Sequence, residues 1–279
     1  MNGPSHSLSS KALVHLTLLG YSLNALFPIL LVIINSFKSR RAIFMDPLAL
    51  PGPDSFSLDG YAKVLEESNF LLFFGNSLLV TLVPLFLVML FGAMAAWALS
   101  EYRFRGNRLL ALFLAMGIMV PIRLGTVSIL EIMVGLNLVN TQMALILVYT
   151  AQGLPLAILI LTEFVGQVPE ELKEAARCEG VSEYRLFFQI ILPLIRPAVA
   201  TVAIFTMVPI WNDLWFPLIL APGPSTQTIQ LGVQQFIGQY ATDWNSVLSA
   251  LSLAVLPVLV LYAFLSQHLI RGLTSGAVK

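Results

Sequence analysis

Long apolar stretches alternate along this chain with short polar segments. A membrane-spanning helix needs about 20 consecutive, mainly apolar residues. Six stretches approach or exceed that length: residues 13–36, 70–99, 109–128, 142–164, 198–220 and 246–270. Pro121 and Arg123 interrupt the third of them. The pattern predicts an all-α integral membrane protein with six transmembrane helices, and the even number places both termini on the same side.

The basic residues indicate which side that is. Loops that face the cytoplasm carry an excess of lysine and arginine. With the N-terminus inside, only five of the 15 basic residues fall in outer segments: Lys38, Arg40, Arg41, Lys63 and Arg123. We therefore expect cytoplasmic N- and C-termini.

Composition narrows the class further. The chain is 57% hydrophobic and 11% charged, with a mean hydropathy of +0.85, whereas soluble domains carry roughly 25% charged residues. A net charge of zero gives no basic field for nucleic acid. One cysteine and three scattered histidines provide neither a disulfide nor metal-ligand spacing. No Ser/His/Asp or Cys/His set stands on plausible elements, so we expect a non-catalytic subunit.

Residues 165–197 form a polar segment between two apolar stretches. Pro169 suits a first helical position, and two glutamates follow it, where the helix dipole favours negative charge. Gly180 can adopt the left-handed conformation that ends a helix. Ser182 then suits the cap of a second helix. The segment therefore predicts a helical hairpin.

The first helix of this hairpin has a small apolar stripe, because Leu172, Ala175 and Ala176 stand at i, i+3 and i+4. Small side chains let another backbone approach closely, and Lys173 and Arg177 can frame such a contact with polar pairs. The alternative is an amphipathic hairpin lying on the lipid surface. Five glutamates in the hairpin argue against anionic lipid, so the residues favour docking of another protein.

The spacing of this loop resembles that of a known family. Glu174-Ala175-Ala176, three residues, Gly180, nine residues, Ile190 and then Leu192-Pro193 is similar to the cytoplasmic coupling loop of binding-protein-dependent ABC importers. Cys178-Glu179 stands where that pattern usually has Ile-Asp. Other matching stretches narrow the resemblance to the carbohydrate-uptake, maltose-transporter-like branch and to its second permease: residues 74–78, 102–106, 135–141, 211–218, 240–245 and 271–279.

The resemblance implies a type I ABC importer transmembrane fold in a bacterial inner membrane. It divides the chain into an N-terminal span and outer loop (1–69), a transmembrane core (70–271) and a cytoplasmic tail (272–279). The implied partners are a paralogous permease, two ATP-binding subunits that bind ATP and magnesium, and an extracytoplasmic solute-binding protein. The residues implied to couple to the ATPase are Glu174, Ala175, Ala176, Gly180, Leu192 and Pro193.

The chain itself shows no nucleotide site. A phosphate-binding P-loop requires the pattern G-x4-G-K-[ST], and the nearest imitation, from Gly272 to Gly276 with Lys279, has neither the spacing nor the hydroxyl. We therefore expect no cofactor in this chain. The resemblance also implies that the tail enters the ATPase interface, with Gly272, Thr274, Ser275 and Gly276 as candidates, although a frayed end is the alternative.

The substrate path is suggested by one acid deep in an apolar stretch. Asp213 is that acid, and intramembrane ionisable residues are functional candidates. Trp211 and Trp215 stand at i and i+4, where two rings can stack on a sugar while Asn212 or Asp213 accepts hydroxyl protons. The alternative is that these two polar residues satisfy the backbone freed by Pro217 or pair with the partner permease. Arg123 is expected to form an ion pair with Glu131 or to contact the receptor.

One rival function fits the same composition. An ion-coupled secondary transporter of a small polar solute would also have many spans and broken helices, but it needs a relay of buried acids and usually an internal repeat. A membrane-embedded hydrolase needs a nucleophile or metal set at membrane depth. The sugar cannot be read from the sequence, because a binding protein or the second permease can set specificity.

Overall fold

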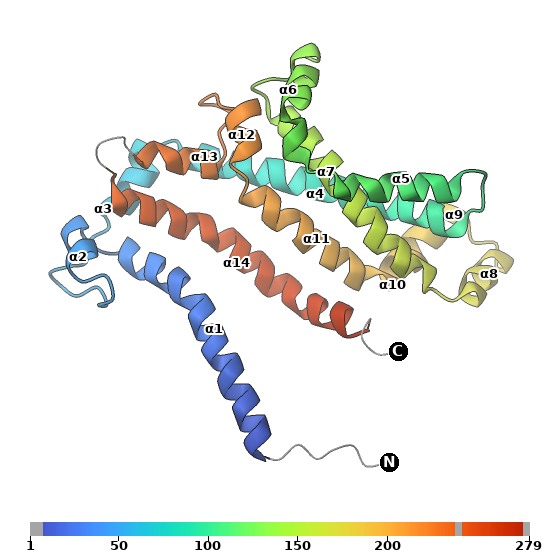
Figure 1. The fold of residues 1–279 in the computed structure, drawn as a ribbon, viewed down its shortest axis with the longest axis horizontal. Helices are drawn as coiled ribbons and strands as arrows, with labels where there is room; N and C mark the ends of the chain where they lie inside the picture. The colour runs from blue at the N-terminus through green and yellow to red at the C-terminus, as the bar shows by residue number, and fades with distance from the viewer. Residues whose placement is uncertain (1–7, 238–241, 276–279) are drawn as a thin grey trace. The chain divides into compact units, whose positions relative to one another are not determined.

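The computed structural model describes residues 8–237 and 242–275, and these are helical apart from two isolated bridges, Lys38 with Phe56 and Ile237 with Thr242, and the connecting turns. The long helices of Figure 1 are α1 (Leu8–Ser36), α4 (Phe70–Glu101), α7 (Gln142–Gly166) and α14 (Trp244–Ser275). Those of intermediate length are α5 (Asn107–Met119), α6 (Thr126–Gly135), α8 (Glu170–Cys178) and α11 (Arg196–Trp211). The short ones are α2 (Arg40–Met45), α3 (Asp59–Ala62), α9 (Glu183–Arg185), α10 (Leu192–Leu194), α12 (Trp215–Leu220) and α13 (Ile229–Val233).

Three helical segments are long and apolar enough to cross a membrane: residues 12–36, 70–101 and 142–166. Two further candidate spans are bent pairs, α5 with residues 122–135 at 87° and residues 183–194 with α11 at 75°. The described residues thus provide three to five spans by length and composition, and the expected number of six is not confirmed.

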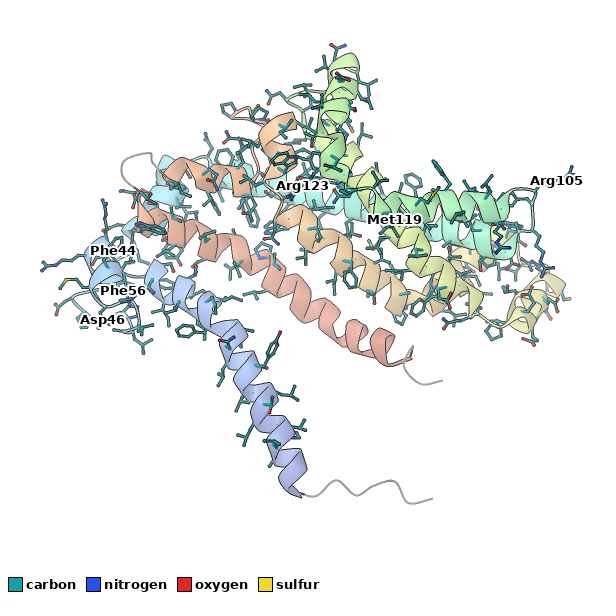
Figure 2. The ribbon with its side chains drawn as sticks, viewed as in Figure 1. Phe44, Asp46, Phe56, Arg105, Met119 and Arg123 are labelled. Carbon is teal, nitrogen blue, oxygen red and sulfur yellow. The ribbon has the colours of Figure 1, made fainter. Side chains whose placement is uncertain are left out.

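Proline chemistry explains the bend in the expected third span. Pro121 has no backbone N–H and disfavours helical geometry in the residue before it. Val120 is accordingly extended, with φ −83° and ψ 115°, and α5 ends one residue earlier, at Met119. Met119 and Arg123 therefore lie on opposite sides of the break (Figure 2). The expected fifth span is also interrupted, because α11 ends at Trp211 and α12 begins at Trp215.

The described chain forms two compact units. Of the described residues, the first comprises 8–70, 233–237 and 242–255. Its core includes Lys38, which is 1% exposed and donates to the carbonyl oxygens of Asp46 (2.9 Å) and Pro47 (3.4 Å). Although the charge pattern assigns Lys38 to an outer loop, its ammonium is buried and holds the loop after α1 in place. Asn245 of α14 donates to the Lys38 carbonyl and closes this unit.

The second unit comprises the described residues 71–232 and 256–275. In it, α5 and α11 both pack on α7 (Figure 1). Close packing of α4 on α7 depends on glycine: a Cβ added at Gly92 would lie 2.9 Å from the Cβ of Ala157, and one at Gly153 would lie 2.7 Å from Val88. Small residues at such contacts let membrane helices approach closely.

Neutral side chains near the start of α4 hold the loop that follows α12. Asn76 is 4% exposed and donates to the carbonyl oxygens of Ser225 (3.0 Å) and Gln227 (2.9 Å). The Ser77 hydroxyl accepts the N–H of Ile229 at 2.8 Å. These contacts satisfy backbone groups of the loop without burying a charge.

Candidate functional site

The hairpin after α7 begins as the sequence predicts. Pro169 occupies the N-cap of α8 with extended geometry, and Glu170 and Glu171 fill the first turn. Gly180 has φ +75°, and its N–H bonds to the carbonyl of Arg177 while that of Val181 bonds to Ala176, both at 3.0 Å. A helix commonly closes on a left-handed residue of this kind. The length of α8 is therefore fixed locally.

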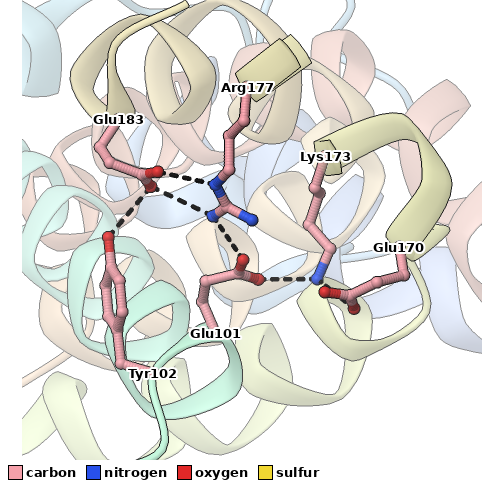
Figure 3. Close-up of polar contacts among 6 residues, drawn as sticks. All are labelled: Glu101, Tyr102, Glu170, Lys173, Arg177 and Glu183. Carbon is pink, nitrogen blue, oxygen red and sulfur yellow. Dashed lines mark hydrogen bonds and ion pairs between the residues drawn. The ribbon is translucent and has the colours of Figure 1, made fainter. Parts of the chain in front are cut away.

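The inner side of α8 is tied to the end of α4 by charge (Figure 3). Lys173 Nζ lies 2.6 Å from Glu101 Oε2, and Arg177 Nη2 donates to the other carboxylate oxygen of Glu101. Lys173 also pairs with Glu170 at 2.9 Å, and Arg177 Nε with Glu183 at 2.8 Å. The side chains of Glu101 and Lys173 are 5% and 7% exposed. A buried charge is tolerated when it is paired in this way.

The pairing keeps these groups charged. Burial alone would lower the pKa of the Lys173 ammonium, but hydrogen bonds to Glu101 and Glu170 raise it above its ordinary value. The hydrogen bond from Arg177 lowers the pKa of the Glu183 carboxyl, and the Tyr102 hydroxyl, which donates to Glu183 at 3.0 Å, acts in the same direction. At neutral pH the cluster therefore contains two cations held by three carboxylates.

The second half of the hairpin is held by apolar packing. Leu186, Phe187 and Ile191 are buried in one cluster with residues of α4, α7 and α11. The ring of Phe187 lies 6.4 Å from that of Trp97 in α4. Leu192 packs against the same cluster, and Pro193 lies within α10, partly buried. Leu192 and Pro193, two residues of the expected coupling set, therefore lie on the packed side of the hairpin.

The structure corrects the expected orientation of α8. Ala176 is 8% exposed and belongs to the internal cluster, so it is not on the open face. Lys173 and Arg177 pair inside the protein instead of framing an outside contact. Glu174 and Ala175 are exposed, as is Leu172 at 41%. The open face therefore has one small residue at its centre, where two were expected.

The expected substrate-path residues do not form one helical face. Trp211 ends α11 and is 3% exposed, with its ring 6.1 Å from that of Phe74. Trp215 starts α12 and is 41% exposed. Because the helix breaks between the two rings, the i, i+4 relation fails. Asn212 is exposed and donates to the Val208 carbonyl at 2.9 Å, which closes α11.

Asp213 caps the second half of the break. Its carboxylate accepts the N–H groups of Trp215 (3.2 Å) and Phe216 (3.1 Å), and the Tyr149 hydroxyl donates to it at 2.9 Å. Arg123 lies 3.6 Å from one oxygen of the carboxylate. The sequence predicted Glu131 as the ion-pair partner of Arg123, but the partner is Asp213. Asn212 and Asp213 thus both bond to backbone at the helix break, although the groups that they meet belong to Val208, Trp215 and Phe216 and are not the backbone freed by Pro217 that the sequence suggested.

Arg123 and Trp215 form the accessible part of this region. The guanidinium lies 5.9 Å from the centre of the Trp215 ring, whose Nε1 donates to the Thr126 hydroxyl at 3.0 Å. The Arg123 side chain is 68% exposed. Beside it lies a cavity of about 60 Å³, lined by Ile122, Arg123, Tyr149, Gln152, Pro209, Ile210, Asp213 and Phe216. An exposed ring edged by a cation and a carboxylate can contact a polar ring compound.

The expected tail is only partly described. Gly272, Thr274 and Ser275 lie within the helical backbone of α14, which continues past the expected end at residue 270, and Gly276 lies outside the described residues. Among residues 8–237 and 242–275, no group of three or more histidine, cysteine, aspartate or glutamate side chains is placed to hold a metal ion.

Sequence reasoning missed Glu101 and Tyr149. Glu101 is the first acid after 31 residues of α4 that contain none, and this position was the available signal. Its partners lie 72 and 76 residues away, so the pairing itself could not be read locally. Tyr149 gave no signal, because a tyrosine in an apolar helix is common.

Comparisons with known proteins agree with this architecture. The family described as binding-protein-dependent transport system inner membrane component matches residues 60–275. A diacetylchitobiose uptake system permease protein of Streptomyces coelicolor is 32% identical, over 96% of this chain and 89% of its own length. An arabinooligosaccharides transport system permease protein of Halalkalibacterium halodurans is 30% identical, over 91% of each chain.

Solved structures show the fold. A chain from a bacterial ABC transporter involved in the import of the acidic polysaccharide alginate has a TM-score of 0.80 and 21% identity, with 96% of this chain and 100% of that chain covered. A chain from the alginate transporter bound to its periplasmic protein has a TM-score of 0.67 and 13% identity, with 91% of each chain covered. The expected all-α transmembrane fold of an ABC importer is thus confirmed, although the count of six spans is not.

The cap at the helix break makes a stability prediction. Asp213→Ala removes the acceptor of two backbone N–H groups and leaves the Tyr149 hydroxyl, which is buried, without the carboxylate. An unsatisfied buried group costs about 1–3 kcal/mol, and each kcal/mol shifts the melting temperature of a chain this size by roughly 2–4 °C. We expect a corresponding decrease in the thermal unfolding midpoint of the purified protein in detergent.

Two variants serve as controls for this prediction. Asn212→Ala alters the neighbouring, exposed residue and should shift the midpoint less. Tyr149→Phe combined with Asp213→Ala removes the stranded hydroxyl and should recover part of the loss, because deleting both partners costs less than deleting one. Equal midpoints for Asp213→Ala and Asn212→Ala would contradict the assignment of Asp213 as the cap.

Proposed function

Because this chain belongs to the family of binding-protein-dependent transport system inner membrane components, we propose that α8 docks onto a separate ATP-hydrolysing subunit. The chain is a permease, and its sugar-importer relatives favour a sugar or sugar-like solute as cargo. It acts with a paralogous permease, two ATP-binding subunits and an extracytoplasmic binding protein. ATP and magnesium are bound by the partner subunits, since no P-loop pattern occurs in this sequence.

The observation that carries the docking proposal is the asymmetry of α8. One side is fixed to α4 by paired charges, and the other presents Leu172 and Ala175 beside Glu171 and Glu174. A helix with one anchored side and one open apolar strip fits a groove in a partner. The two glutamates favour basic residues at the rim of that groove. Because α8 is anchored to α4, a docked partner that moves would displace α8 as a rigid element.

The relatives support an oligosaccharide as the substrate class. Among this chain's own residues, Trp215 and Arg123 are the candidates to contact it, because both are exposed and adjacent. Trp211 is buried and contributes through packing. Asp213 is 10% exposed and already bonded to Tyr149 and to backbone. An ion-coupled transporter would need such an acid free to exchange protons, so this arrangement favours the ATP-driven importer.

The docking proposal makes a direct prediction. Ala175→Arg places a long cation at the centre of the open face, and an unpaired buried charge in a contact costs several kcal/mol. We expect the variant to insert in the membrane at normal amount but to lose the ATP-binding subunits encoded with it when it is purified by affinity tag. The readout is the ratio of ATPase subunit to permease on a stained gel.

Gln189→Arg is the matched control, because it adds the same charge at an exposed position in the other half of the hairpin. It should retain the ATPase subunits. If the Ala175→Arg complex retains them as well, α8 is not the docking element. If no ATPase subunit accompanies the unaltered chain, the assignment as an importer permease is wrong.

The substrate proposal predicts the effect of removing one ring. Trp215→Ala should lower the uptake of labelled oligosaccharide by cells carrying the whole transport system about two- to tenfold, because a ring contact contributes about 0.5–1.5 kcal/mol. Diacetylchitobiose and arabinooligosaccharides are the first sugars to test. Trp215→Phe keeps an aromatic face and should retain most of the uptake.

Trp244→Ala is the control for loss of a half-exposed tryptophan, since Trp244 is 43% exposed and Trp215 is 41% exposed. Its effect on uptake should be small. If both alanine variants lose uptake to the same extent, Trp215 is not a substrate contact. If the unaltered system takes up no sugar from a broad panel, the proposed substrate class is wrong.

The orientation is proposed from the charge bias, with α8 and both termini in the cytoplasm. Single cysteines at Ser182 and Ser225, neither of them buried, should then react from opposite sides in a Cys178→Ser background. A membrane-impermeant maleimide applied to intact spheroplasts should label position 225 and not 182, and in inverted vesicles the pattern should reverse. Labelling of both positions from outside would overturn this topology.

A further inference from the structure

The carboxylates of the charge cluster beneath α8 come from two parts of the chain. Lys173 and Arg177 stand one turn apart on α8 and face the same side. Two of the carboxylates that receive them, Glu170 and Glu183, belong to the hairpin itself. The third, Glu101, is the last residue of α4 and accepts from both cations at once (Figure 3). Among the described ion pairs, only those of Glu101 join α8 to a long apolar helix.

Apolar packing cannot replace this link. The buried residues of α8 are Lys173 and Ala176, so a single methyl group is the apolar side chain that α8 buries. Burial of one methyl group contributes little to holding a helix in place. The following segment differs, because Leu186, Phe187 and Ile191 anchor it in the internal cluster. Without Glu101, the contacts that α8 keeps with the rest of the unit are its two ends, the Ala176 methyl group in the internal cluster and Lys173 beside the ring of Trp97.

We propose that Glu101 is a positioning residue that makes α8 and α4 move as one body, so that a displacement of α8 by the ATPase passes into the α4 helix. This inference rests on the proposed function, because it needs a partner that moves α8. Removing the Glu101 carboxylate breaks both ion pairs that join α8 to α4, whereas the pairs within the hairpin remain. Glu101→Gln therefore frees α8 from α4 while Glu170 and Glu183 still hold the two cations.

The experiment measures the distance between the two helices directly. Spin labels are placed at Phe86→Cys, exposed on α4, and at Glu179→Cys, exposed after α8, in a Cys178→Ser background. Pulsed electron paramagnetic resonance is recorded on the purified complex with its ATPase subunits, without nucleotide and with magnesium-ATP plus vanadate. With Glu101 present, we expect one narrow distance distribution that nucleotide leaves unchanged.

In Glu101→Gln without nucleotide, the distance distribution should match that of the unaltered chain. When nucleotide is bound, the distribution should shift or broaden by several ångströms. Two variants test the cause. Glu170→Gln removes an exposed partner of the same lysine and should behave like the unaltered chain. Glu101→Asp keeps a carboxylate for both cations and should show little of the nucleotide-dependent shift.

Three results would overturn the proposal. One is a nucleotide-dependent shift with Glu101 intact. Another is an unchanged distribution in Glu101→Gln with nucleotide. The third is a distribution already broadened in Glu101→Gln without nucleotide, which would make Glu101 a residue that merely folds the loop. Loss of the ATPase subunits from the unaltered complex is a separate outcome, because it refutes the proposed function and this inference together.

Discussion

The ion pairs of Glu101 are the contact that determines which side of α8 faces the protein. A carboxylate and an ammonium removed from water each carry a desolvation cost of several kcal/mol, and their attraction offsets it only when the geometry is good. In this cluster Glu101 meets both Lys173 and Arg177, and each of these cations has a second carboxylate. Every charge in the cluster therefore has a partner, and loss of Glu101 leaves both cations with the carboxylates of the hairpin alone.

This constraint explains the direction that α8 faces. Two cations one turn apart must turn toward Glu101, so the positions opposite them on the helix turn outward. Ala176 stands beside the cations and is buried, while Ala175 stands on the open side. The small residue that a partner can approach is thus selected by charges on the other side of the helix.

Local signals predicted the boundaries of the hairpin well. Pro169, Gly180 and Ser182 act within a few residues of themselves, and the structure has each at the expected helix end. The predicted facing of α8 was wrong because Glu101 lies 72 residues from Lys173 in the chain. The break in the expected fifth span was missed for a similar reason, because hydropathy cannot register that Asp213 caps a new helix with help from Tyr149.

The length of α4 shows why its polar contacts lie at the two ends. A helix of 32 residues rises about 48 Å, whereas the hydrocarbon core of a bilayer is about 30 Å thick. The ends of α4 can therefore extend beyond the apolar layer, and a buried acid can occur at Glu101 without standing in lipid. Asn76 near the other end is bonded to the loop after α12, and Gly92 between them packs closely on α7. A single helix thus links the charged contact beneath α8 to the neutral contact at the far end, which is the geometry that a transmitting element requires.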